Sequence, residues 1–499
     1  MGTVRTGPMA MIARLCDRSL LAAVVALLAV SRPAGAQIWT LGADVGLGET
    51  DNVTLASSNK TTQTMATADV DFAVLEQSRL FNVNAKGDFS DYDYLQHAYP
   101  NELIGRLDGV AKIALLPDRL TWVLQEDFGQ SQLDPYTPQT PSNRQNVNYV
   151  STGPDLDLRL GGTGFVDLSL RYADADYQDS PFDSNRLFGS LALGLRLSPT
   201  SSVSLNVDSE RVLFKNTEFN SDFDLGNAYV RYTAQGARTQ LTANLGATEV
   251  REGATPTIGP TTTTGLLAQL GLTRTLSPSA QLSLSAARQL TDPGSSFSSI
   301  QGGAITAITF GPAILTSAPY TADSVSGLWS YQRNRTTIKV SARWEKDNYH
   351  SAPIYNNTRG GGEFSVERQL THAFSAQLLG RWYKTDYPAG PVAFTPRFFT
   401  EGEILLAESE VLPPPVTSGD FTTSTIGAGL SWRHGRWLEV RLRYEHNSES
   451  VTGEGSGYNQ NSVFLTVGYR PLSNQPAGTF QPGGTFQPAG TPTIPQTNQ

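Results

Sequence analysis

Residues 66–89 read ATADVDFAVLEQSRLFNVNAKGDF, and this stretch decides the fold. Apolar side chains occupy every second position before the short polar segment Glu76-Gln77-Ser78, and again after it. Successive side chains of a β-strand point to opposite faces, so one face is apolar while the other carries Asp69, Asp71 and Lys86. The stretch therefore predicts two amphipathic strands joined by a tight turn.

The same alternation continues from Gln37 to Tyr469. It gives twenty segments, with a range of about 18 to 22 because the segments near Asn146 and Leu225 are less regular. Nine short connections, rich in Gly, Pro, Asn and Ser, alternate with ten long ones such as 291–321 and 385–420. Tight turns at one end and long loops at the other are typical of outer-membrane barrels. We expect an all-β, transmembrane, antiparallel up-and-down β-barrel, closed because lipid cannot satisfy an open strand edge.

The alternative is a soluble β-sandwich, which would bury bulky side chains in a core. Here the apolar face is rich in Ala and Gly and often ends in an aromatic residue, which suits a lipid interface better than a packed core. Charged residues make up only 17% of the 499 residues, and the mean hydropathy of -0.27 excludes a polytopic helical membrane protein. The single cysteine, Cys16, excludes a disulfide scaffold.

Three regions follow from these patterns. Residues 1–36 resemble a signal peptide, with Arg14 and Arg18 before an apolar run and a cleavage site between Ala36 and Gln37. Residues 37–471 form the predicted barrel, located in the outer membrane of a Gram-negative bacterium. Residues 472–499, which repeat GTFQP, predict a disordered Gly/Pro/Thr/Gln-rich periplasmic tail. Removal of residues 1–36 takes away four arginines and one aspartate, so the net charge falls from -9 to -12.

The sequence carries none of the common motifs for catalysis or metal binding. The five histidines show no metal-ligand spacing, and neither a G-x-S-x-G motif nor a phosphate-binding Gly-rich loop occurs. We therefore expect no enzymatic activity, cofactor or metal, and the acidic charge argues against nucleic-acid binding. The first strand directly follows the predicted cleavage site, so we also expect no folded plug domain of the kind found in TonB-dependent transporters.

The predicted inward face carries charges of both signs. Its candidate lumen-lining residues are Asp44, Asp69, Asp71, Lys86, Asp88, Arg106, Asp108, Lys112, Arg159, Arg171, Arg196, Lys339, Arg343, Arg381, Arg433, Glu439, Arg441, Arg443 and Glu445. Two interpretations remain open: a hydrated wall held by salt bridges, or a transverse field with an acidic and a basic side that sorts solutes. In the second, Arg433, Arg441 and Arg443 would bind carboxylated sugars.

Aromatic residues and long loops extend this hypothesis. Tyr383, Trp437 and Phe464 are candidates for stacking against sugar rings. Loops 291–321 and 385–420 are long enough to fold into the mouth as constrictions. A barrel of twenty strands would enclose a wider lumen than porins of about 16–18 strands.

The chain resembles the beta-barrel porin type 2 family and the related exosortase-associated outer-membrane barrels. The resemblance rests on GETDNV at 48–53 and on NYVSTGP at 148–154 leading into LDLRLG at 156–161. It covers the whole barrel. Because members are often encoded near genes for exopolysaccharide synthesis and export, it implies a role in polysaccharide passage across the outer membrane. It supplies no catalytic residues.

The leading hypothesis is thus a non-enzymatic outer-membrane barrel forming a wide polar conduit for exopolysaccharide. Alternatives are a general diffusion porin for small solutes and a surface-interaction barrel with a blocked lumen; an outer-membrane enzyme ranks last. The expected partners are outer-membrane lipid, the barrel insertion machinery and components of polysaccharide export. The oligomeric state stays open.

Overall fold

The computed structural model describes residues 36–134, 137–217, 220–254, 259–297, 316–387, 420–435, 437–452 and 457–473. Residues 1–35 of the predicted signal segment 1–36, residues 474–499 of the predicted tail 472–499, and most of the predicted inward loops 291–321 and 385–420 lie outside the described residues. Residues 472 and 473, predicted to begin the tail, instead belong to the last strand and pair with the first.

The described residues form twenty β-strands. They are β1 (Ala36–Thr50), β2 (Gln63–Gln77), β3 (Phe81–Tyr94), β4 (Glu102–Leu116), β5 (Leu120–Gln132), β6 (Arg144–Leu160), β7 (Gly164–Tyr177), β8 (Ser184–Ser198), β9 (Ser201–Phe214), β10 (Phe223–Gln235), β11 (Thr239–Glu252), β12 (Thr261–Ser277), β13 (Ala280–Thr291), β14 (Tyr320–Arg333), β15 (Thr336–Tyr349), β16 (Asn357–Gln369), β17 (Phe374–Asp386), β18 (Phe421–His434), β19 (Leu438–Val451) and β20 (Tyr458–Ser473).

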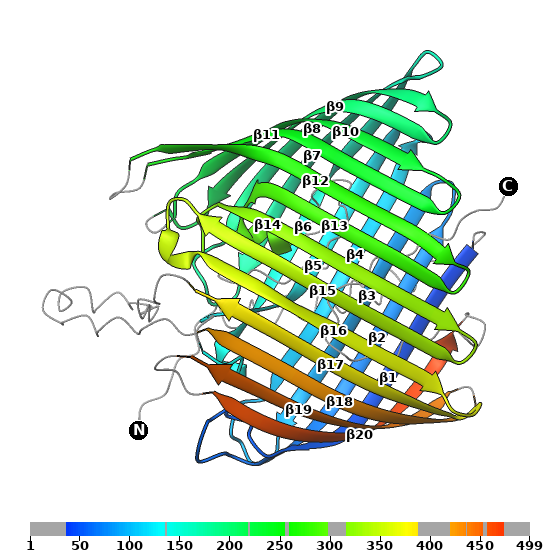
Figure 1. Ribbon diagram of the computed structural model, residues 1–499, viewed down its shortest axis with the longest axis vertical. Coiled ribbons are helices and arrows are strands. Elements are labelled where there is room, and N and C mark those ends of the chain that lie inside the picture. The colour runs from blue at the N-terminus through cyan, green and yellow to red at the C-terminus, as the bar shows by residue number, and fades with distance from the viewer. Residues whose placement is uncertain are drawn as a thin grey trace, which may run out of the picture.

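The sheet closes into a barrel. Each strand pairs antiparallel with its neighbours in sequence, and β1 also pairs antiparallel with β20, with Asp44 opposite Gly468. In Figure 1 the tight turns lie at the right and the long connections at the left, and the last strand ends on the tight-turn side. The predicted all-β barrel of about 20 strands is confirmed.

Turn chemistry explains the tight connections. Asp118 and Asn334 adopt left-handed φ angles of 62° and 53° in the β4–β5 and β14–β15 turns, a conformation that Asp and Asn tolerate better than most residues. Longer connections at the opposite end carry three short helical segments, η1 (Pro141–Asn143), α2 (Pro293–Phe297) and η2 (Pro353–Tyr355).

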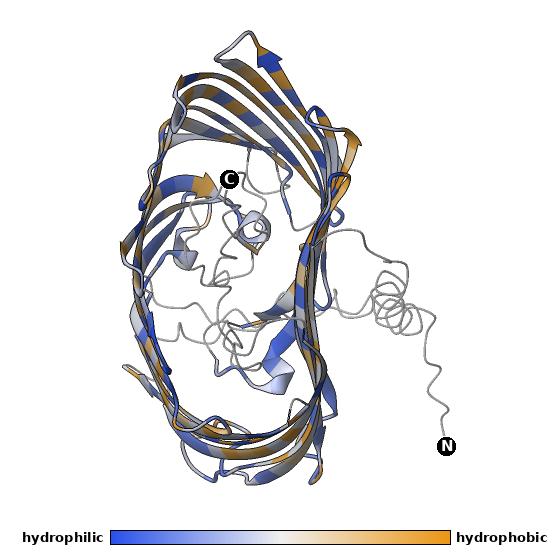
Figure 2. Ribbon diagram, turned by 90° about the vertical axis from the view of Figure 1, so that its right-hand side faces the viewer, coloured by the Kyte–Doolittle hydropathy of each residue, from blue (hydrophilic) through white to orange (hydrophobic). Residues whose placement is uncertain are grey.

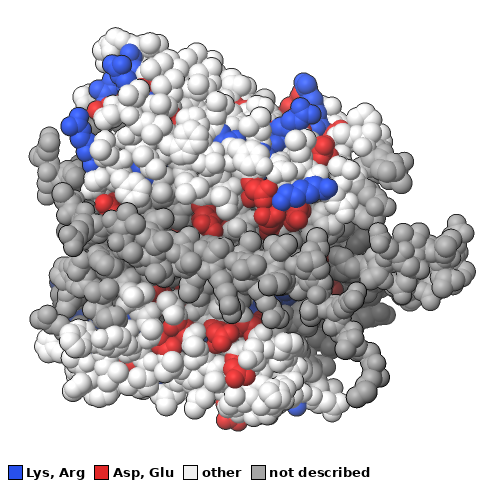
Figure 3. Space-filling model, turned by 180° about the vertical axis from the view of Figure 1, so that it is seen from behind, with Lys and Arg blue, Asp and Glu red and all other residues white. Residues whose placement is uncertain are grey.

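The outer face of the barrel is apolar and exposed. Along β8, Leu187, Leu193 and Leu197 alternate with inward residues and are 49–60% exposed, and Leu245 at the centre of β11 is 63% exposed. Figure 2 shows apolar and polar bands alternating along the strands, and in Figure 3 most of the described surface bears no charge. Because a water-soluble protein does not expose apolar surface on this scale, the surface is one that faces lipid.

Aromatic side chains lie on this same outer face. By register they include Phe89, Phe128, Tyr172, Tyr232, Trp329, Trp344, Trp382, Trp432, Tyr444 and Tyr469. Closure, lipid-facing leucines and outer aromatics together make the chain an outer-membrane β-barrel of the Gram-negative type.

No helix within the described ranges is both long enough and apolar enough to cross a membrane.

The inner face is polar over most of the wall, with buried apolar clusters near the long loops. There Val212, Phe214, Phe223, Leu225, Val250 and Leu290 form one buried cluster, and Val147, Tyr149, Ala173, Ala175 and Tyr177 form another. These two clusters are formed by residues of β6, β7, β9–β11 and β13, and Phe297 of α2 packs against the second.

Candidate functional site in the barrel lumen

The register places all nineteen candidate lumen residues on the inner face. Cross-strand pairs such as Asp44 with Asp69, Asp71 with Asp88 and Lys86 with Asp108 share a face, and the alternation carries that face around the whole barrel. The other candidates follow on β4, β6–β8, β15 and β17–β19. What the structure adds is the partners of many of these charges.

Four charges from different strands meet where the barrel closes. Arg441 on β19 lies 2.5 Å from Asp44 on β1, and Arg470 on β20 lies 2.7 Å from the other oxygen of Asp44. Arg470 also reaches past β1 to Asp71 on β2, at 3.0 Å. Gly42 makes this possible, because a Cβ at that position would lie 1.9 Å from the Arg470 guanidinium.

The predicted basic cluster is therefore paired within the wall. Arg433 lies 3.8 Å from Glu439, and Arg443 lies 3.6 Å from Glu445. The Arg443 guanidinium also stacks 5.2 Å from the ring centroid of Phe464, an inner-face residue of β20. A carboxylated solute would have to compete with these partners.

The three candidate stacking aromatics divide between the two faces. Phe464 and Tyr383 lie on the inner face, and the Tyr383 hydroxyl donates to Glu363 at 3.5 Å. Trp437 instead packs edge-on against Tyr469 on the outer face, with ring centroids 6.4 Å apart. The expectation that Trp437 serves the lumen is wrong, because its turn places the ring beside the lipid-facing aromatics.

A second paired group lies on β15–β17. Arg359 contacts both Glu345 and Asp347, and Arg343 contacts Glu345; all four side chains are buried. Next to them, Arg381 pairs with Glu363 at 3.0 Å. Buried charges are tolerated when they are paired in this way, so this part of the wall is held by its own salt bridges.

Charges of opposite sign thus meet where the first and last strands close the barrel. Acidic residues of β1–β3 adjoin basic residues of β19 and β20 because the first and last strands pair. The described inner faces of β12–β14 carry no charge and interact through neutral groups. Asn244 of β11 donates to Gln269 at 2.7 Å, and the hydroxyls of Ser285 and Ser326 lie 2.6 Å apart.

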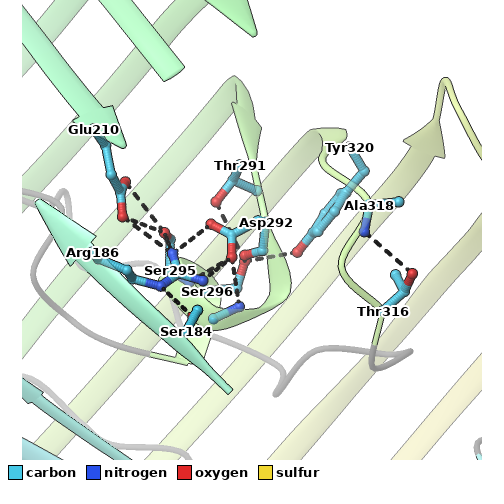
Figure 4. Close-up of polar contacts among 11 residues, drawn as sticks. Ser184, Arg186, Glu210, Thr291, Asp292, Ser295, Ser296, Thr316, Ala318 and Tyr320 are labelled. Carbon is cyan, nitrogen blue, oxygen red and sulfur yellow. Dashed lines mark hydrogen bonds and ion pairs between the residues drawn. The ribbon is translucent and has the colours of Figure 1, made fainter. Parts of the chain in front are cut away.

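At the long-loop end, α2 lies against the inner wall of distant strands (Figure 4). Arg186 of β8 donates to both carboxylate oxygens of Asp292, at 3.0 and 2.5 Å, and to Glu210 of β9 at 3.1 Å. Ser295 of α2 accepts a hydrogen bond from Arg186 at 2.8 Å. We call Arg186, Glu210, Asp292 and Ser295 the mouth cluster; all four are buried.

Local packing explains this close approach. Asp292 accepts hydrogen bonds from the backbone N–H groups of Gly294 and Ser295, which fixes the first turn of α2. A Cβ at Gly294 would lie 2.2 Å from the Arg186 guanidinium, so glycine is needed there. Phe297 packs into the apolar cluster that contains Tyr149 and Tyr177.

Burial opposes ionisation of Asp292, but the attraction of Arg186 and the hydrogen bonds that the carboxylate accepts outweigh it. They hold the pKa of Asp292 below its usual value. The carboxylate is therefore the charged partner of Arg186 at neutral pH.

Sequence patterns missed several of these residues. Arg186 precedes Leu187, where the clear alternation begins, although the period of two extends back to Ser184. Arg470 follows the last aromatic residue, Tyr469, where the clear alternation ends, yet it has the parity of the inner face. Asp292 lies in a loop, and nothing in its local sequence marks its partner.

Among the described residues, no group of three or more His, Cys, Asp or Glu side chains is arranged to hold a metal ion.

Comparisons with known proteins give weak likenesses only. No protein-family model matches the sequence, and no curated protein matches it. The solved copper transporter OprC is 10% identical with a TM-score of 0.42, over 88% of this chain and 81% of that one. The FrpB iron transporter from Neisseria meningitidis (F3-3 variant) is 10% identical with a TM-score of 0.42, over 87% and 81%. Pseudomonas aeruginosa OccK2 in complex with glucuronate is 11% identical with a TM-score of 0.34, over 87% and 98%. These likenesses assign no substrate to this chain.

Proposed function

We propose that this protein is a non-enzymatic conduit for hydrated polar solutes across the outer membrane, and that its substrate is an exopolysaccharide. The observation that carries the conduit is the polar inner face of a closed barrel of twenty strands. A wall of this kind holds water, and water-filled barrels pass polar molecules.

The pairing of wall charges supports a hydroxylated polymer as the substrate. Groups such as Arg441 with Asp44 and Arg381 with Glu363 already neutralise each other, and β12–β14 add neutral hydroxyls and amides. Conduction requires contacts weak enough for the solute to leave, and such a wall offers many exchangeable hydrogen bonds. The resemblance to exopolysaccharide-linked barrels favours the same substrate, with export components and the insertion machinery as partners.

A diffusion porin for small solutes is the second candidate. It is favoured by α2, which lies inside the barrel at the long-loop end and reduces the space for a polymer.

Planar-bilayer recording tests the conduit. The purified protein should conduct ions in steps, and polymers small enough to enter should lower that conductance; absence of current would contradict both channel functions and favour a blocked barrel. Deletion of the gene, with complementation as the control, tests the substrate. Loss of surface polysaccharide supports export, whereas unchanged polysaccharide with slower uptake of a small solute would contradict it and favour the porin.

A further inference from the structure

The link between α2 and the opposite wall has an unusual composition. The segment Pro293–Phe297 reads PGSSF, so only Phe297 offers a large apolar surface. Its ionic contact with the wall runs through the Arg186 guanidinium, which is 2% exposed. Hydrogen bonds also join Ser295 to Glu210 and Ser296 to Tyr320. The ionic part of the attachment of α2 therefore depends on one cation supplied by β8.

This cation is shared between two carboxylates. Asp292 arrives with α2, whereas Glu210 stays on β9 whether or not α2 is attached. Arg186 also lies 5.9 Å from the ring centroid of Tyr149. Glu210 and Tyr149 would thus keep the guanidinium partnered after α2 leaves, which lowers the cost of detachment compared with exposing a lone buried charge.

From this arrangement we infer that α2 is a gate, held inside the mouth by Arg186 and released when the Arg186–Asp292 contact breaks. The inference rests on the proposed conduit. Arg186 and Glu210 form the fixed half of the contact, and Asp292 and Ser295 form the moving half. Detachment of α2 widens the mouth and admits larger solutes.

The test uses Arg186→Met, which keeps the length of the side chain and removes its charge. The matched control is Arg211→Met, because Arg211 is an outer-face arginine of the neighbouring strand β9 that contacts Asp224 instead of α2. In bilayers, Arg186→Met should raise the unit conductance at least about twofold, since the constriction leaves the pore, while the control stays at the wild-type value. An Arg186→Met conductance equal to wild type would overturn the gate.

A second readout is independent of current. The only cysteine of the chain lies in the predicted signal segment, so Ser295→Cys gives the mature barrel a single thiol on α2. Its labelling by a membrane-impermeant maleimide should be slow in the wild-type background. It should become about tenfold faster with Arg186→Met, because local opening exposes it. Faster labelling without any current would support the movement of α2 and contradict the conduit. Current with an unchanged labelling rate would support the conduit and contradict the gate.

A reversible cross-link excludes misfolding as the cause. Ser295 Oγ lies 3.4 Å from both carboxylate oxygens of Glu210. In Arg186→Met carrying Glu210→Cys and Ser295→Cys, a cleavable thiol cross-link should restore the low conductance, and reduction should raise it again in the same channel. A cross-linked channel as conductive as the reduced one would refute the gate.

Discussion

Arg470, three residues before the end of the last strand, donates a 2.7 Å hydrogen bond to Asp44 on the first strand. The two side chains are 7% and 2% exposed. Their strands lie at opposite ends of the barrel sequence, so this contact exists only once the barrel has closed. It is a direct marker, inside the wall, of correct pairing between β20 and β1.

Loss of this contact should weaken the closed barrel. Arg470→Met leaves Asp44 with Arg441 alone and removes the partner of Asp71. Breaking a buried pair from one side costs about 3–5 kcal/mol, so the urea midpoint in detergent should fall markedly. The control is Lys86→Met, whose half-exposed pair with Asp108 should be worth less than about 1 kcal/mol. If Arg470→Met and Lys86→Met lowered the urea midpoint equally, the Arg470–Asp44 pair would contribute no more to stability than a partly exposed ion pair.

The glycine beside the pair should be just as sensitive. A Cβ at Gly468 would lie 1.9 Å from the Asp44 carboxylate, so Gly468→Ala must displace Asp44 from its partners. We expect Gly468→Ala and Arg470→Met to be strongly non-additive in a double-mutant cycle of unfolding free energies, because both remove one interaction. Additive losses of unfolding free energy would mean that Gly468→Ala destabilises the barrel through an interaction other than the Arg470–Asp44 contact.

The sequence predicted the architecture well because lipid and water impose opposite polarities on the two faces of every strand. Apolar and polar residues therefore alternate wherever one face of a strand meets lipid and the other face meets water. The two segments with weak alternation, near Asn146 and Leu225, have a physical explanation. Their inner-face residues, such as Val147 and Phe223, pack into buried clusters near α2 instead of meeting water.

Which charges lie inward was also predictable, but their pairing was not. Parity places Arg441 and Asp44 on the inner face, whereas their contact requires knowledge that β20 and β1 are neighbours. A transverse field across the lumen is a natural interpretation while the pairing of the first and last strands is unknown. Closure of the barrel places the acidic residues of β1–β3 beside the basic residues of β19 and β20.

Charge on the lipid face should prevent stable insertion. Leu245 lies at the centre of β11 on the outer face, and Leu245→Arg places a guanidinium in the hydrocarbon core. The expected cost is about 2–4 kcal/mol of folding free energy in bilayers. Thr242→Arg, on the inner face of the same strand, is the control and should fold normally. A folded yield for Leu245→Arg equal to the control would contradict the assignment of the outer face.

The ion selectivity of the pore should depend on Arg433 and Arg443, two partly exposed arginines on the inner faces of β18 and β19. Arg433→Gln together with Arg443→Gln removes two positive charges from the lumen while Glu439 and Glu445 remain. The reversal potential in a salt gradient should therefore shift toward cation selectivity. Arg211→Gln is the control, because that arginine is on the outer face beside Asp224. An unchanged reversal potential would place both arginines outside the conducting path.

Acidification should detach α2 through Asp292. The charged and titratable groups around this carboxyl are Arg186, Glu210, Tyr177 and Tyr320. Because attachment lowers the pKa of Asp292, the attached state is favoured fully above the ordinary Asp value of 3.8 and loses this stabilisation as the pH falls through the lower value of the attached state. Unit conductance should therefore stay constant through neutral and mildly acidic pH and rise only below that range. Asp292→Asn should give the high conductance already at neutral pH, since the amide attracts Arg186 less strongly than a carboxylate does. A rise near neutral pH in the wild type, or a pH profile unchanged by Asp292→Asn, would assign the titration to a different group.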